Sequence, residues 1–193
     1  QLVFMIATAG VPVAISKLIS EQVATFRYDV SYKTLKISGM ILVSIGAVTS
    51  VGMAALAGPL SVMIGFPESY LVILALSPTL LFTSVSCAFR GYFQGRSNMI
   101  PTGISQIIEQ AVNTVFTVLF AWVMYRYGAN YAMSHGIVSE ENIHLEAVKY
   151  AAAGATAGTS LGALASALYL CRVYLKNRAV IMEELTHSVQ SDE

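Results

Sequence analysis

Residues 37–64 read ISGMILVSIGAVTSVGMAALAGPLSVMI and contain no charged side chain. A bilayer core about 30 Å thick is crossed by about 20 apolar residues, and they must be helical because no water is present to bind exposed backbone groups. The Gly58-Pro59 pair is expected to end the helix early, which leaves residues 60–67 as a short connector. We therefore predict a membrane crossing over residues 37–58.

Four further segments of the chain meet or approach the same length. They are residues 2–20, 71–89, 100–125 and 150–171. The first of these is interrupted by Pro12 and Lys17, whereas the last is uncharged. The sequence thus predicts an all-α fold, a polytopic membrane helical bundle of about five transmembrane helices.

The composition agrees with a surface that faces lipid. The chain is 55% hydrophobic and only 11% charged, whereas soluble domains carry roughly 25% charged residues. Basic and acidic residues are equal in number, at 11 each, so the chain has no overall attraction for polyanions and nucleic acid is not an expected partner.

No pattern in the chain predicts enzymatic chemistry. Cys87 and Cys171 lie in apolar stretches, without neighbours at metal-ligand or redox spacing. A Walker-type glycine loop, a Rossmann fingerprint and a His-Glu-x-x-His helix are all absent from the sequence. We therefore expect neither enzymatic activity nor a metal or cofactor.

The basic residues predict how the chain is oriented. When the connections between crossings are assigned alternately to two sides, one side receives only Arg126 and Lys149. The other side receives nine basic residues: Lys17, Arg27, Lys33, Lys36, Arg90, Arg96, Arg172, Lys176 and Arg178. By the positive-inside rule the side with nine is cytoplasmic, so residues 127–146 are predicted to be external.

A polar stripe runs along the segment 100–125. Its members recur every three or four residues and so share one helix face: Thr102, Ser105, Gln106, Glu109, Asn113 and Thr117. A carboxylate at membrane depth must be paired, protonated or in contact with water, which favours a face that lines a cavity for substrate. The alternative is that the stripe only forms hydrogen bonds to neighbouring helices.

Three basic residues on the cytoplasmic side are candidates for binding phosphate. Arg90 and Arg96 flank a glycine-containing segment after the third crossing, which we expect to be a loop, and a guanidinium suits bidentate phosphate recognition. Lys17 is the third candidate, although its spacing from Glu21 also fits a surface salt bridge within one helix. Both arginines are equally well explained as positive-inside anchors.

Small residues recur every fourth position in the last crossing, at Gly154, Gly158, Gly162 and Ser166. Such a ridge lets two helix backbones approach closely within a membrane. We therefore predict that this face packs against another helix.

Three motifs resemble a known family. They are GVPVAISKLISE at residues 10–21, FRGYFQG at residues 89–95, and IPT followed by SQIIEQ within residues 100–110. Together, in this order and spacing, they resemble the polysaccharide transporter family that includes stage V sporulation protein B. That family belongs to the multidrug/oligosaccharidyl-lipid/polysaccharide exporter superfamily, which also contains the lipid II flippases.

The resemblance implies an architecture and an activity. It implies two six-helix lobes around a central cavity, with the five crossings matching the second to sixth helices of the N-terminal lobe. Residues 181–193 would then be a cytoplasmic polar connector, and the chain is expected to be part of a longer polypeptide. The implied activity is the flipping of a lipid-linked saccharide across the bacterial cytoplasmic membrane by alternating access, driven by an ion gradient or membrane potential. Arg90, Arg96, Glu109, Lys17 and Glu21 match motif positions of the family.

Two alternatives to a saccharide flippase remain open on the sequence. One is a multidrug exporter of the same superfamily, in which Glu109 carries a coupling proton or sodium ion. The other is a membrane scaffold that does not transport and serves envelope or spore assembly. The expected partners are therefore membrane lipid, a lipid-linked saccharide and possible coupling cations.

Overall fold

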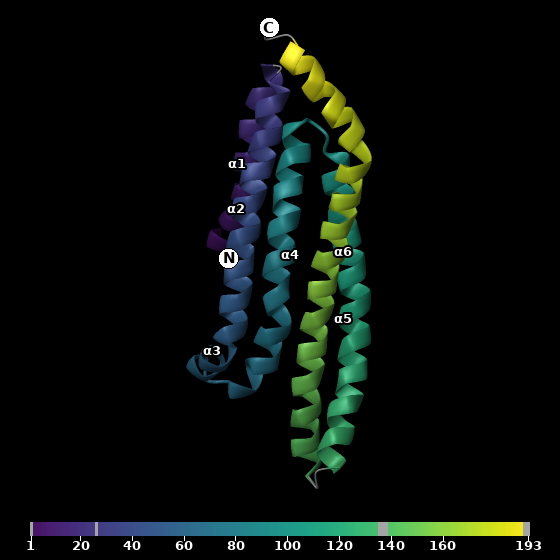
Figure 1. The fold of residues 1–193 in the computed structure, drawn as a ribbon. Coiled ribbons are helices and arrows are strands. Elements are labelled where there is room, and N and C mark those ends of the chain that lie inside the picture. The colour runs from purple at the N-terminus through teal and green to yellow at the C-terminus, as the bar shows by residue number, and fades with distance from the viewer. Residues whose placement is uncertain (1, 26, 135–138, 191–193) are drawn as a thin grey trace. The chain divides into compact units, whose positions relative to one another are not determined.

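The computed structural model describes residues 2–25, 27–134 and 139–190, and it describes side chains within residues 10–178 of these. Helices account for nearly all of the described chain, and no strand occurs in it. The elements are shown in Figure 1 and run in the order α1 (Leu2–Ala24), α2 (Tyr28–Ala55), α3 (Ala57–Met63), the 3-10 helix η1 (Pro67–Ser69), α4 (Tyr70–Gly95), α5 (Ile100–Ser134) and α6 (Glu140–Gln190). The predicted all-α class is confirmed.

Four helical segments are long and apolar enough to cross a membrane. They are Tyr28–Ala55, Pro67–Gly95, Ile100–Ser134 and Glu140–Arg178. The fifth predicted crossing falls in α1, where residues 2–9 lie outside the part whose side chains are described. That crossing stays a prediction, whereas the polytopic membrane bundle is confirmed.

The helices are longer than the apolar stretches that predicted them. α2 begins before residue 37, α4 continues past residue 89 to Gly95, and α5 continues past residue 125 to Ser134. α6 also extends in both directions, so residues 181–190 continue a helix. Hydropathy marks only the part of a helix that is apolar, whereas the backbone hydrogen bonds that define the helix continue through polar residues.

The Gly58-Pro59 pair lies inside a short helix and not at the end of a long one. α2 ends at Ala55, and α3 begins two residues later with Pro59 in its first turn. A proline is tolerated there because the first N–H groups of a helix have no partner within the helix. The chain leaves α3 at Gly65, whose φ of 82° is favoured by glycine after a helix end. Residues 60–66 thus lie between two candidate crossings, as predicted for a connector, but residues 60–63 of this connector are helical.

The chain divides into two compact units, and each long helix from α2 onward contributes to both. Unit 1 comprises residues 1–46, 83–107 and 166–193, and unit 2 comprises residues 47–82 and 108–165. All nine basic residues assigned to the cytoplasmic side belong to unit 1, whereas Arg126 and Lys149 belong to unit 2. The connections that the charge pattern assigned to one side therefore fall within one unit.

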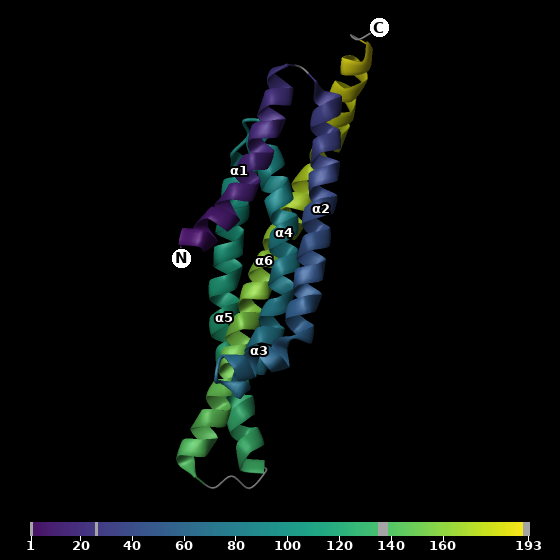
Figure 2. The same cartoon turned by 90° about the vertical axis from the view of Figure 1, so that its left-hand side faces the viewer.

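The core of unit 1 is an apolar cluster in which α1 packs closely on α4 (Figure 2). Its buried members come from four helices: Ile15, Ile19, Leu35, Tyr92, Phe93 and Leu170. A Cβ atom added to Gly91 or Gly95 would lie 2.8 Å or 2.6 Å from the Cβ atoms of Ile15 and Ile19, respectively. The two glycines of the FRGYFQG motif thus allow two helices to touch, and the expected loop over this segment is wrong.

In unit 2, α5 and α6 lie side by side along the predicted glycine ridge (Figure 1). A Cβ atom added to Gly158 would lie 2.5 Å from the backbone nitrogen of Thr117, and one added to Gly162 would lie 2.7 Å from the carbonyl oxygen of Glu109. These separations are too short for any side chain, so only glycine permits this approach. The predicted packing role of the ridge is confirmed.

The orientation predicted from the basic residues is tested by single cysteines introduced after Cys87→Ala and Cys171→Ala. We expect Arg27→Cys, Lys33→Cys and Ser97→Cys to react with an impermeant maleimide only after the membrane is permeabilised. Ser134→Cys and Ser139→Cys should react in intact cells, because the external side carries few basic residues. The reverse labelling pattern would invert the orientation and place the basic connections outside the cell.

Candidate functional site

Arg90 lies inside α4 and joins three helices within unit 1. Its Nε donates a hydrogen bond to Ser105 Oγ of α5 at 3.1 Å, and its Nη2 donates to Ser166 Oγ of α6 at 2.8 Å. The side chain is half-buried, while Ser105 and Ser166 are fully buried. We call Arg90, Ser105 and Ser166 the Arg90 cluster.

Two more buried hydroxyls lie one helical turn from members of this cluster. Ser86 precedes Arg90 on α4, and Thr102 precedes Ser105 on α5. Ser86 Oγ and Thr102 Oγ1 have no hydrogen-bond partner among the described residues. A buried hydroxyl without a partner costs about 1 to 3 kcal/mol, so this part of unit 1 retains polar groups with unused bonding capacity.

Arg96 follows the last residue of α4 and turns back onto that helix. Its Nη1 donates to the hydroxyl of Tyr92 at 2.9 Å, and its guanidinium carbon lies 5.7 Å from the centre of the Tyr92 ring. Arg90 and Arg96 therefore engage different partners. The chain reverses just after them at Ser97, which has a φ of 58°.

Lys17 and Glu21 are both exposed on α1. Neither takes part in an ion pair among the described residues, although their spacing permits one. The structure thus does not bring Lys17 into the Arg90 cluster, and its role in phosphate binding stays a prediction.

The polar stripe of α5 divides between the two units. In unit 1, Thr102 and Ser105 are buried and Gln106 is exposed, and Ser105 Oγ donates to the Thr102 carbonyl at 2.7 Å. These contacts join the first turns of α5 to the Arg90 cluster. Whether they line a cavity stays a prediction.

In unit 2 the stripe faces the glycine ridge of α6. Thr117 Oγ1 donates to Asn113 Oδ1 at 2.9 Å and to the Ala155 carbonyl at 3.2 Å. Such bonds between helices are what the alternative interpretation of the stripe expects. Glu109 is half-buried, with its backbone carbonyl against Gly162.

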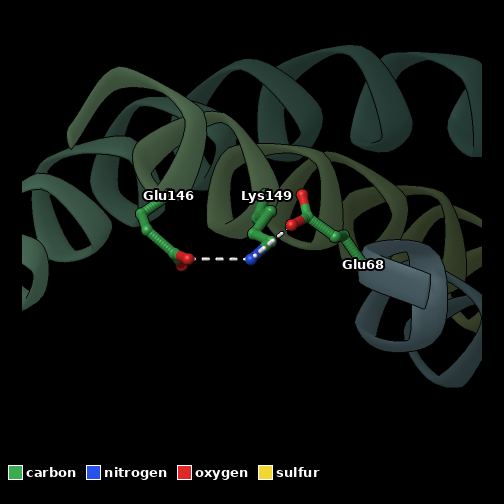
Figure 3. Close-up of polar contacts among 3 residues, drawn as sticks. All are labelled: Glu68, Glu146 and Lys149. Carbon is green, nitrogen blue, oxygen red and sulfur yellow. Dashed lines mark hydrogen bonds and ion pairs between the residues drawn. The ribbon is translucent and has the colours of Figure 1, made fainter. Parts of the chain in front are cut away.

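A group of three charged residues was missed by sequence reasoning. Lys149 Nζ lies 2.9 Å from Glu68 Oε1 and 2.8 Å from Glu146 Oε1, as Figure 3 shows. The spacing of Glu146 and Lys149 within α6 could have been read from the sequence, but their contact with η1 could not. Glu68 lies between the second and third predicted crossings, and Glu146 and Lys149 lie between the fourth and fifth. Alternating the connections places both of these on the external side, and the contact agrees with that assignment. All three side chains are partly exposed, so the pairs are expected to contribute less than about 1 kcal/mol each.

Tyr127, Tyr131 and Tyr150 form an aromatic cluster in unit 2. The ring centres of Tyr127 and Tyr150 are 5.6 Å apart, and those of Tyr131 and Tyr150 are 5.9 Å apart. Tyrosines with an apolar ring and a polar hydroxyl are enriched at the boundary between lipid and water. The cluster therefore fits the end of a membrane crossing.

These features define a multi-pass helical membrane protein with a partly buried arginine among hydroxyl groups. The chain matches the family described as polysaccharide biosynthesis protein over residues 1–190. The chain belongs to this family, so the resemblance to the polysaccharide transporter family is confirmed and the protein is a multi-pass bacterial membrane protein.

Curated relatives from Bacillus subtilis (strain 168) also match the chain. It is 32% identical over 183 residues to stage V sporulation protein B, which covers 90% of this chain and 31% of that protein. It is 31% identical over 121 residues to the lipid II flippase MurJ, covering 58% and 22%, and 32% identical over 129 residues to the uncharacterized membrane protein YabM, covering 65% and 23%. The chain thus spans about a third or less of the length of these relatives. No solved structure matches it significantly.

The bonds of the Arg90 cluster are tested by comparing two buried serines. Ser166→Ala removes an acceptor of Arg90, so it should lower the free energy of unfolding by about 1 kcal/mol, since hydrogen bonds between membrane helices average about 0.6 and reach about 1.7 kcal/mol. Ser86→Ala removes a hydroxyl without a partner and should leave stability unchanged or higher. Thermal unfolding of the purified protein in detergent measures both. Equal losses in the two variants would show that the Arg90–Ser166 bond contributes nothing.

Proposed function

We propose that this chain is part of an exporter that flips lipid-linked saccharides across the cytoplasmic membrane by alternating access. Membership of the polysaccharide biosynthesis family supports this proposal, as does the similarity to a protein named as a lipid II flippase. The single observation that carries it is the Arg90 cluster, because a guanidinium among hydroxyl groups suits a ligand that combines phosphate and sugar.

The chemistry of the cluster suggests how binding could move helices. Arg90 is held by two neutral hydroxyl oxygens, one from α5 and one from α6. A hydrogen bond to a charged phosphate oxygen is roughly twice as strong as one between neutral groups, and a phosphate accepts two parallel bonds from a guanidinium. A substrate diphosphate would therefore compete with Ser105 and Ser166 for Arg90. When it binds, α4 would lose polar links to α5 and α6.

Replacing Arg90 with lysine tests whether this residue binds phosphate or only anchors the cytoplasmic end of its helix by its charge. Arg90→Lys keeps the charge but removes the planar fork, so translocation should fall at least about tenfold if bidentate binding is used, because one lost charge-assisted bond is worth about 1.5 to 3 kcal/mol. The control is Arg172→Lys, which changes an exposed arginine of α6 that also belongs to unit 1. The measurement is transfer of a fluorescent polyprenyl diphosphate oligosaccharide across vesicles that contain the intact protein. Equal transfer by the two variants would make Arg90 an anchor.

Glu109 is our candidate for coupling transport to a cation. It lies half-buried on the polar stripe of an otherwise apolar crossing, where a charged group is costly unless it serves a pathway. We propose that Glu109 faces the substrate cavity, with Asn113 and Thr117 of the same unit as its polar lining. A proton or sodium ion bound by the carboxylate would supply the coupling.

The coupling role predicts a pH effect that a structural role would not produce. Glu109→Gln retains the size of the side chain and most of its hydrogen bonding, so the protein should insert normally but lose the dependence of transport on pH. Glu141→Gln changes an exposed carboxylate at the start of α6 and should keep that dependence. Both variants are measured in the same vesicles across a series of pH values. Normal transport by Glu109→Gln at every pH would assign Glu109 to packing, and cation-driven drug efflux without saccharide transfer would favour a multidrug exporter.

A further inference from the structure

A groove of about 540 Å³ lies in unit 1 between α2, α4 and α6. Its α2 side is formed by one face of that helix and includes Tyr32, Lys36, Gly39 and Met40. The volume lies within the range of about 300 to 1,000 Å³ that holds small ligands in proteins. None of the residues of the Arg90 cluster lines it.

The lining of the groove is mostly apolar, and its one charged residue lies toward one end. Met40 and Val43 of α2 and Val85 of α4 line it, whereas Lys36 lies nearer the start of α2. Tyr32, one turn before Lys36 on α2, and Tyr174 of α6 also line the groove, and each carries a hydroxyl group. The groove thus has the polarity of a lipid, with a cation and hydroxyls at one end and hydrocarbon contacts beyond them.

Lys36 is not used by any ion pair among the described residues. Lys33, one turn earlier on the same helix, lies 3.6 Å from Asp29. Lys36 therefore offers a positive charge that forms no ion pair with an acidic residue in the part of the chain that the structure describes. This charge complements a ligand with one negative charge.

The length of the groove matches one leaflet of a bilayer. The residues that line it on α2 run from Tyr32 to Ser44, which is about 18 Å at about 1.5 Å per residue. Half of a hydrocarbon core of about 30 Å is about 15 Å. Because Lys36 belongs to the predicted cytoplasmic side, the leaflet concerned is the inner one, which is rich in anionic lipids.

We propose that this groove is a binding site for an anionic glycerophospholipid of the inner leaflet. Its phosphate would lie at Lys36 and the two tyrosine hydroxyls, and one acyl chain would run past Gly39 and Met40 toward Val43. The negative charge of such a lipid is complementary to Lys36, the one charged residue among those that line the groove. The site is distinct from the Arg90 cluster and does not depend on the proposed transport activity.

Gly39 gives a direct way to block the groove. A Cβ atom added to Gly39 meets no atom within 4 Å, so a larger side chain there enters open space without a clash. Gly52 lies later on the same helix, does not line the groove, and is equally unobstructed. Gly39→Leu and Gly52→Leu are therefore matched variants that differ in whether the added side chain enters the site.

Binding is measured by native mass spectrometry of the intact protein with phosphatidylglycerol and phosphatidylcholine. Lys36→Gln should weaken phosphatidylglycerol binding about fivefold, since a basic residue near an anionic lipid surface is worth about 1 kcal/mol. Lys33→Gln should have a smaller effect, because that lysine is paired. Gly39→Leu should reduce binding of phosphatidylglycerol, while Gly52→Leu leaves it unchanged. Equal binding of the two lipids, or equal losses in each matched pair, would overturn the proposal.

Crosslinking in cells identifies the occupant of the groove. Met40→benzoylphenylalanine, activated by light in the intact protein, should attach to a glycerophospholipid. A crosslink to another segment of the polypeptide or to a second copy would show that protein covers the groove. A crosslink to a polyprenyl lipid would assign the groove to the transported substrate and would also overturn the proposal.

Discussion

The constraint that governs this protein is that every backbone N–H and C=O group inside a bilayer must find its partner within the protein. A helix satisfies nearly all of them locally, and for that reason long uncharged stretches such as residues 37–55 have only one stable conformation in lipid. In the residues that the structure describes, irregular backbone is accordingly confined to short segments, such as the turn at Gly65 and the reversal at Ser97. The rest of the fold is decided by how these helices pack against one another.

Because lipid tails are as apolar as leucine, hydrophobicity alone does not bring these helices together. The helices associate because their backbones approach closely at glycines. Gly91 and Gly95 of α4 pack against α1, and Gly158 and Gly162 of α6 pack against α5. Hydroxyl groups add polar links at the same contacts. Thr79 and Ser160 join α4 to α6 in unit 2, as Arg90 and Ser166 do in unit 1.

The same packing produces the two sites that we propose. Arg90 is held at the contact of three helices, so any ligand that draws its guanidinium away acts directly on helix association. The groove between α2, α4 and α6 has the opposite character, because its lining is mostly apolar and a Cβ atom added to Gly39 would meet no atom within 4 Å. One feature suits a transported substrate, and the other suits a resident lipid.

The sequence alone determined the helical class, the crossings after α1 and the glycine ridge, because bilayer thickness and helix periodicity act on each segment separately. It also identified Glu109 as unusual, because a carboxylate is costly at membrane depth, and it selected Arg90 as a phosphate candidate, although it expected that residue in a loop. Only the tertiary structure decided that Arg90 binds Ser105 and Ser166, that Gly91 and Gly95 pack on α1, and that Lys149 meets Glu68. These contacts join residues on different helices. Which residues of two helices meet depends on how each helix is rotated about its own axis. That rotation is set by packing between helices, which the sequence of a single segment does not specify.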